Sequence, residues 1–138
     1  MVALACDDGQ IKLLKESSLE LDTCFFFDDV ACTSLSFTGT GNLLAGYANG
    51  SLAVYDTSSK KQIKQLKVAD ESINQILVHD NSAYCLVCGQ IFTVDLEKDT
   101  IENQITEKAI AAVSLGREHL ALVVADGTEA QVFSLAQH

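Results

Sequence analysis

The sequence has 138 residues, the length of one ordinary domain, and its 48% hydrophobic and 20% charged residues indicate a globular chain. No apolar run approaches the roughly 18 residues that a membrane-spanning helix needs, so we expect no membrane span. The net charge of −10, with nine Lys and Arg residues, argues against direct nucleic-acid binding, because phosphate contacts depend on basic side chains.

The start of the chain and its cysteines predict a cytoplasmic or nuclear location. The opening residues reach Asp7 and Asp8 without the basic region and long apolar segment of a secretory signal. Five cysteines are an odd number, and we expect them to be reduced thiols rather than disulfides.

The first predicted unit, residues 1–30, contains three strands. Runs of β-branched, aromatic and aliphatic residues are separated by Asp, Gly and Ser, which favour turns. The strands are predicted at 2–6, 11–15 and 19–26, and the first strand of a four-stranded unit is missing.

The second unit, residues 31–69, is a complete four-stranded antiparallel meander. Its middle hairpin contains Asn49-Gly50, a strong hairpin pattern that predicts a type I′ turn with positive φ at both residues.

Two further units follow, at 70–107 and 108–138. The segment 107–115 has helix formers at helical spacing, but Leu35, Ile76 and Leu115 keep the spacing of the repeat, which favours a strand. The predicted strands are 72–78, 83–88, 91–96 and 101–106 in the third unit, and 110–115, 120–125 and 130–135 in the fourth.

The four units share one period. The hairpin glycines Gly9, Gly50, Gly89 and Gly127 are 41, 39 and 38 residues apart. The residues that close the next strand keep nearly the same steps: Lys15, Asp56, Asp95 and Ser134. A period near 40 residues with four strands per unit is typical of a β-propeller blade.

On these repeats the chain resembles the WD-repeat β-propeller family. Tyr55-Asp56 and Val94-Asp95 stand where that family has its Trp-Asp dipeptide, although the chain contains no Trp. The resemblance implies a non-catalytic scaffold that binds other proteins within a larger complex and needs no cofactor.

The predicted fold is therefore all-β, a partial β-propeller of about four blades with incomplete first and last blades. A closed propeller needs at least four whole blades. We expect either a fragment of a larger propeller, whose main partner surface lies outside this chain, or a homo- or hetero-oligomer that completes the ring. The two open blade faces are expected to carry Leu4, Leu13, Val123 and Val132.

No catalytic or metal-binding constellation is apparent. Cys85 and Cys88 have the spacing of a zinc or redox pair, but residues i and i+3 of a strand point to opposite faces, so we expect both to be buried apolar cysteines. A cysteine-dependent redox protein is the alternative. The three histidines are scattered, and no nucleophile elbow or phosphate loop is present.

Two surface features are candidates for protein binding. Phe25, Phe26 and Phe27 cannot all point inward from one outer strand, so they are either packing residues with one partly exposed or a contact for another chain. The links between blades and the turns between second and third strands hold eight acids and one base, Lys108, which predicts a partner with a basic segment unless these are only solvated turns. The acids are Asp7, Asp8, Asp28, Asp29, Asp70, Glu71, Glu107 and Asp126.

Overall fold

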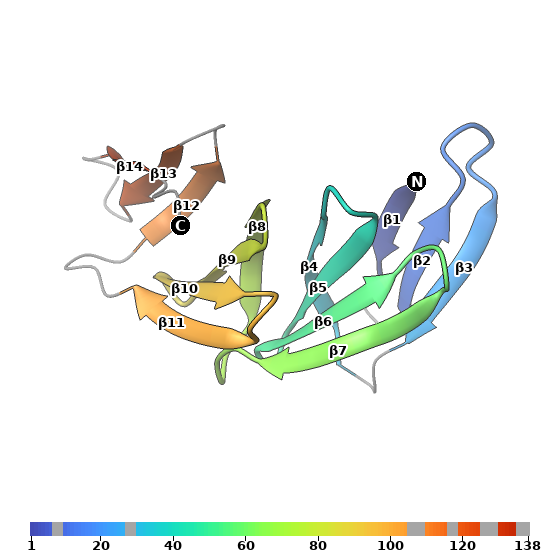
Figure 1. The fold of residues 1–138 in the computed structure, drawn as a ribbon, viewed down its shortest axis with the longest axis horizontal. Coiled ribbons are helices and arrows are strands. Elements are labelled where there is room, and N and C mark those ends of the chain that lie inside the picture. Colours follow the sequence, from blue (N-terminus) through green and yellow to red (C-terminus); the bar gives the residue numbers. More distant parts are fainter. Residues whose placement is uncertain (7–9, 27–29, 105–109, 116–118, 125–129, 135–138) are drawn as a thin grey trace.

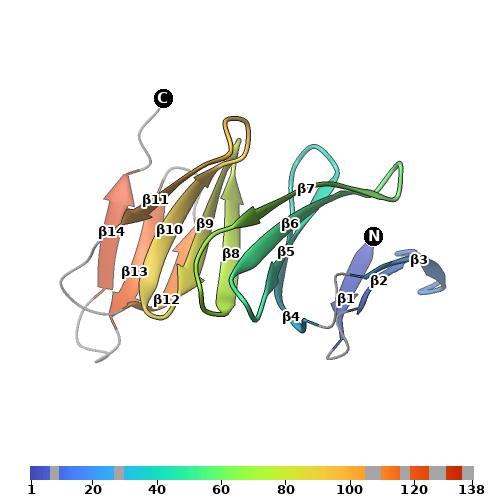
Figure 2. The same ribbon diagram turned by 90° about the horizontal axis from the view of Figure 1, so that it is seen from below.

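The chain forms four antiparallel β-sheets placed side by side in an arc (Figure 1). The computed structural model describes the backbone of residues 1–6, 10–26, 30–104, 110–115, 119–124 and 130–134, and the side chains of these residues up to 102. The view from below shows the sheets as successive units, from β14 at one end to β3 at the other (Figure 2). This arrangement confirms the predicted all-β partial propeller.

The first sheet has three strands and the second has four. Each follows chain order, so each is a meander. The strands are β1 Val2–Ala5, β2 Gln10–Leu14 and β3 Leu21–Phe26 in the first sheet, then β4 Cys32–Phe37, β5 Asn42–Tyr47, β6 Ser51–Asp56 and β7 Lys61–Lys67 in the second.

The third sheet repeats the four-stranded meander and the fourth has three described strands. Residues 110–115 form a strand, as the repeat spacing predicted over the helical alternative. The strands are β8 Ile73–His79, β9 Ser82–Val87, β10 Gln90–Asp95 and β11 Thr100–Gln104, then β12 Ile110–Leu115, β13 His119–Val124 and β14 Ala130–Ser134.

The hairpin turns differ from the prediction in type. The β5–β6 loop has three residues, Ala48 to Gly50, and only Gly50 has positive φ, at 84°. It is closed by a bond from Gly50 N–H to the Tyr47 carbonyl at 3.0 Å, so the predicted type I′ turn at Asn49-Gly50 is wrong. The two-residue loop with positive φ at both positions is instead Cys88-Gly89, between β9 and β10.

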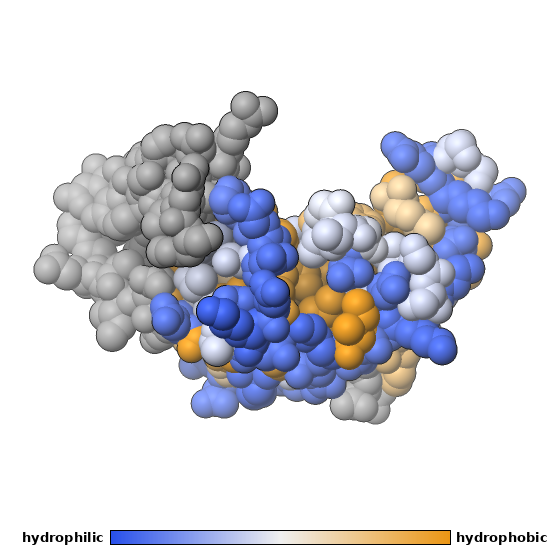
Figure 3. Space-filling model, viewed as in Figure 1, coloured by the Kyte–Doolittle hydropathy of each residue, from blue (hydrophilic) through white to orange (hydrophobic). Residues whose placement is uncertain are grey.

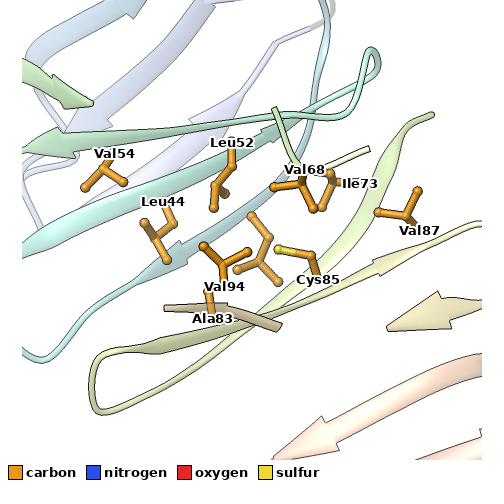
Figure 4. Packing of buried hydrophobic residues seen from close by; sticks show 10 residues of the cluster. Leu44, Leu52, Val54, Val68, Ile73, Ala83, Cys85, Val87 and Val94 are labelled. Atoms are coloured by element: carbon orange, nitrogen blue, oxygen red, sulfur yellow. The ribbon is translucent and has the colours of Figure 1, made fainter. Parts of the chain in front are cut away.

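The core lies between the sheets, and the second sheet is buried on both faces. Leu43, Ala45 and Tyr47 pack against Ile11 and Leu13 of the first sheet. Because side chains alternate along a strand, Leu44 belongs to the other cluster, with Leu52 and Val54, against Ala83, Cys85 and Val94 of the third sheet. Figure 4 shows these side chains pointing toward one another. The prediction that Leu13 lies on an open face is wrong, because it is fully buried between the first two sheets.

Hydrogen bonds fasten the second and third sheets at their inner strands. The hydroxyls of Thr33 and Ser34 donate to the Ile73 carbonyl at 2.6 and 3.0 Å. Gly46 lies beneath this junction, where an added Cβ would come within 2.3 Å of the Ser34 hydroxyl and 2.8 Å of Ile73. The absence of a side chain therefore allows the two sheets to approach closely.

A position can require glycine because its φ is positive or because a Cβ would not fit, and three glycines of this chain distinguish the two reasons. Gly50 has positive φ, and a Cβ added there would lie 2.0 Å from the Ala69 carbonyl oxygen. Gly41 also has positive φ, at 89°, but an added Cβ would meet no atom within 4 Å. Gly39 has neither positive φ nor an atom within 4 Å of an added Cβ. We expect G39A to change the free energy of unfolding by less than about 0.5 kcal/mol and G41A to lower it by about 1 kcal/mol. G50A should lower it by a further 1–3 kcal/mol or so, because backbone must move. Urea unfolding of the three variants measures this, and equal effects of G41A and G50A would contradict the predicted clash.

Candidate functional site

One edge of the arc is built from hairpin turns and inter-sheet links. We call residues 48–50, 68–72 and 88–89 the link edge. The Gly50 carbonyl accepts bonds from the N–H groups of Val68 at 2.9 Å and Ala69 at 3.3 Å, which holds the β5–β6 turn against the link to the third sheet. The thiol of Cys88 contacts the Glu71 carboxylate, so the next hairpin turn lies at the same edge.

The described charges of the link edge are acidic with one nearby base. Asp70 and Glu71 are both exposed. Lys67, at the end of β7, donates to the Asn49 carbonyl, a positive charge that the sequence-based count of this edge omitted. The other acids predicted here, and Lys108, lie outside the described residues: Asp7, Asp8, Asp28, Asp29, Glu107 and Asp126.

At the opposite edge, acids and bases form ion pairs between neighbouring sheets. Lys64 of β7 donates to the Asp99 carboxylate at 2.7 Å and to the Leu96 carbonyl at 2.6 Å, both in the third sheet's outer turn. Lys60 lies 3.7 Å from Asp22 of β3. In each case an outer strand pairs with the outer turn of the following sheet, with the signs exchanged.

A cavity of about 410 Å³ lies beside the Lys64 ion pair, between the second and third sheets. Its lining is mixed, with Val54 and Ile63 next to Thr38, Asn42 and Asp80. Hydrophobic residues are visible in the hollow between these sheets in the space-filling view (Figure 3). The charged side chains at the edge opposite the link edge therefore take part in packing between neighbouring sheets. We call this edge the outer-turn edge.

The aspartates at the family's Trp-Asp position stabilise turns locally. Asp56 accepts bonds from the N–H groups of Ser58 at 2.9 Å and Ser59 at 3.4 Å. Asp95 accepts two bonds at 3.0 Å from the N–H groups of Glu97 and Lys98. These donors lower the pKa of both carboxyl groups, chiefly through Ser58 for Asp56 and Lys98 for Asp95.

The lowered pKa values predict a pH-dependent contribution to stability. In the unfolded chain both groups have a pKa near 3.9, above the folded value, so their stabilisation is complete above that pH and is lost as pH falls through the folded pKa. The D56N/D95N variant cannot titrate at these positions. We expect its deficit in melting temperature, measured at pH 6.5, to shrink steadily toward pH 2.5.

The matched control is D80N, which removes an acid from an exposed turn. A deficit for D56N/D95N that stays constant with pH, or changes no more than that of D80N, would contradict the assignment.

Phe25 and Phe26 lie on opposite faces of β3, as strand alternation requires. Phe25 is buried and stacks on Tyr55 with ring centroids 4.3 Å apart, and Tyr55 shares a 2.7 Å hydrogen bond with the Tyr47 hydroxyl. Burial raises the pKa of both tyrosines. Phe26 is 57% exposed, and Phe27 lies outside the described residues.

The cysteines do not form a chelating or reactive pair. Cys85 is buried, and burial raises its pKa to about 12, while the pKa of Cys32 rises to about 11 for the same reason. The prediction that Cys88 is buried is wrong, because positive φ places it in an exposed turn, where the Glu71 carboxylate raises its pKa. Within the described residues, no three His, Cys, Asp or Glu side chains gather closely enough to hold a metal ion.

Exposure predicts different reactivity for two of these thiols. With a disulfide reagent near pH 8, we expect Cys88 to react in the folded protein and Cys85 to react only on unfolding. Peptide mapping after labelling, with C88A as the control, would assign the sites. Labelling of Cys85 at the same rate as Cys88 in native buffer would contradict the burial.

Sequence reasoning missed three contacts, one within the second sheet and two between neighbouring sheets. These are the Lys64–Asp99 pair, the Tyr47–Tyr55 hydroxyl bond and the bonds to the Ile73 carbonyl. The tyrosine contact alone had a weak pattern in the repeat, since Tyr55 occupies the position of the family's Trp.

The repeated meanders and the junctions between them define a WD-repeat β-propeller domain. The family model described as "Anaphase-promoting complex subunit 4 WD40 domain" matches residues 1–81, more than half of the sequence. The chain belongs to this family of WD40 domains. A search among curated proteins found no match.

Solved propeller structures share the fold at low sequence identity. The designed protein Ika4 matches with a TM-score of 0.82 and 16% identity, over 97% of this chain and 84% of that one. The RRP9 WD40 repeats match with a TM-score of 0.84 and 14% identity, over 98% of this chain and 42% of that one. The U3-55K structure matches with a TM-score of 0.83 and 14% identity, over 98% of this chain and 43% of that one. The chain therefore spans less than half the length of the latter two.

Proposed function

We propose that the chain is a non-catalytic protein-interaction module that acts as a subunit of a larger assembly. The observation that carries this proposal is the contrast between the two edges. At the outer-turn edge, Lys60 and Lys64 are paired with acids across sheets, whereas Asp70 and Glu71 project from the link edge. The family model's description names a complex subunit, which supports the same role.

The proposed partner is a protein with a basic segment, and the proposed surface is the link edge with the adjoining aromatic segment. Acids that share one edge produce a field that steers a basic partner, and net charge of −10 adds to it. The residues are Asp7, Asp8, Phe25, Phe26, Phe27, Asp28, Asp29, Asp70, Glu71 and Asp126. Buried Phe25 contributes by positioning Phe26 outward.

The proposal includes a cytoplasmic or nuclear location, no cofactor, no direct nucleic-acid contact, and a homo- or hetero-oligomer that completes the propeller. The alternative is that this chain is part of a larger propeller whose main partner surface lies elsewhere. This alternative is supported by the match to less than half the length of RRP9 and U3-55K. No helix among the described residues is long and apolar enough to cross a membrane.

The test compares two variants of equal charge. D28N/D29N/D70N/E71Q neutralises four acids of the proposed surface, and E16Q/E20Q/D80N/E97Q neutralises four elsewhere. Stopped-flow association with a synthetic Lys- and Arg-rich peptide should slow by about tenfold in the first variant at low ionic strength and recover toward the wild-type rate in high salt.

The control variant should slow association less than about half as much on a logarithmic scale, because its charges are farther from the binding surface. Equal slowing in both variants would show attraction by net charge alone and contradict a localised site. Pull-down with wild type and the first variant, followed by mass spectrometry, would then identify partners that depend on the link edge.

A further inference from the structure

The first sheet leaves one face uncovered. Strand register separates its residues into two sets, because residues paired between neighbouring strands share a face. Ile11, Leu13 and Phe25 face the second sheet and are buried. The opposite set defines what we call the open face, which is apolar apart from Gln10 and Lys12: Val2, Leu4, Gln10, Lys12, Leu14, Leu21, Cys24 and Phe26.

The open face is apolar and exposed. Leu4 is 45% exposed, and Leu21 and Phe26 are each 57% exposed. Lys12 is its charged member, and a Lys side chain can lay its methylene stem along apolar surface while its ammonium reaches water. In the space-filling view, hydrophobic residues appear among hydrophilic ones at the end formed by β1 to β3 (Figure 3).

The register positions of one inner pair of the open face are buried in the two following sheets, each of which has a sheet before it. The pair Val2–Leu14 corresponds to Leu43–Tyr55 in the second sheet, where both residues are at most 1% exposed. It corresponds to Ala83–Val94 in the third sheet, where both are fully buried. In both sheets the cover is the face of the preceding sheet. In each sheet, the face turned toward the next sheet covers that next sheet. The repeat therefore predicts that such a face, from another blade, fits the open face.

The outer strand strengthens this argument. Leu21 and Phe26 of β3 pair with Leu14 and Gln10, as Gln62 and Lys67 of β7 pair with Tyr55 and Ser51. The first sheet thus has apolar residues where the second sheet, whose outer strand is exposed there, has polar ones. Such apolar substitution at an exposed rim is expected where another chain covers it.

The last sheet has a matching series in its register. The face that covers the third sheet is formed at Leu44, Gly46, Leu52 and Val54 of β5 and β6. The equivalent positions of β13 and β14 are all apolar, with Val123 at the position of Gly46: Ala121, Val123, Ala130 and Val132. One chain therefore combines an apolar open face with the residue types of the complementary face at its other end.

We propose that a second copy of this chain covers the open face with its fourth sheet, so that two copies close a ring through two equivalent contacts. Contacts of this head-to-tail kind form a ring when the rotation closes. The chain matches 42% of RRP9 and 43% of U3-55K, so an arc of this length is less than half of those chains, whereas it matches 84% of the designed Ika4 chain. The proposal rests on the ring completion stated under Proposed function; the open face shares Phe26 with the proposed binding surface but none of its acids.

The test is the oligomeric state of the purified chain, with variants matched for exposure and chemistry. Native mass spectrometry and light scattering at micromolar concentration should show a dimer. L4E and L14E place a charge in the open face outside the proposed binding surface, and each should raise the dissociation constant at least tenfold, which is about 1.4 kcal/mol. The controls I63E and F37E change residues that are 50% and 40% exposed elsewhere, and both should remain dimeric.

A second measurement reports on the face itself. Cys24 lies on the open face and is exposed in the single chain, whereas Cys88 lies at the link edge. Thiol labelling of Cys24 should slow as protein concentration rises, and labelling of Cys88 should not.

Several outcomes would overturn the proposal. These are a folded monomer at tens of micromolar, a dimer equally stable in L4E and I63E, or a complex of more than two chains. A monomer that still binds the basic peptide would reject the two-copy ring and leave the proposed binding function standing, so the two failures are distinguishable.

Discussion

The structure depends on burying both faces of each sheet against its neighbours. In β5 and β6 every residue from Leu43 to Tyr47 and from Ser51 to Tyr55 is buried, which a single meander in water cannot achieve. Burial of apolar surface between neighbouring sheets, worth roughly 25 cal/mol per Å², is the main source of stability. It also requires close approach, which explains why Gly46 lies under Ser34 and Ile73. The blade is therefore a unit of sequence but not an independent unit of stability.

The repeat spacing predicted the strands and their order because turns and period-two alternation are local properties. It assigned residues 110–115 correctly against their helical composition. It could not assign faces without the pairing register, so Leu13 was placed with Leu4 although Leu4 pairs with Lys12 and Leu13 with Ala3. Turn type failed for a similar reason. One extra loop residue at Asn49-Gly50 shifts the turn, and the type I′ geometry occurs at Cys88-Gly89, where Cys88 accepts the left-handed conformation.

The candidate site was predictable only in outline. That links and hairpin turns meet at one edge follows from the meander, and the bonds from Val68 and Ala69 to Gly50 agree with it. The contribution of Lys67 was not predictable, since it depends on how far its side chain extends beyond β7. The ion pairs of Lys60 and Lys64 join residues 38 and 35 positions apart in the chain, a separation at which no sequence pattern specifies contact. Sequence thus indicates which segments share an edge, whereas side-chain reach decides which charges remain available to a partner.

Apart from Phe26, the open face and the proposed partner surface consist of different residues, which allows two associations at once. The open face continues the direction in which sheets stack, whereas the link edge runs along the side of the stack. A ring closed by rotation about the axis of the arc would bring the link edges of both copies to the same side. A partner with two basic segments could then bind both copies, and the second contact would form at the high effective concentration set by the first. Ring closure would therefore strengthen partner binding without any new contact at the link edge.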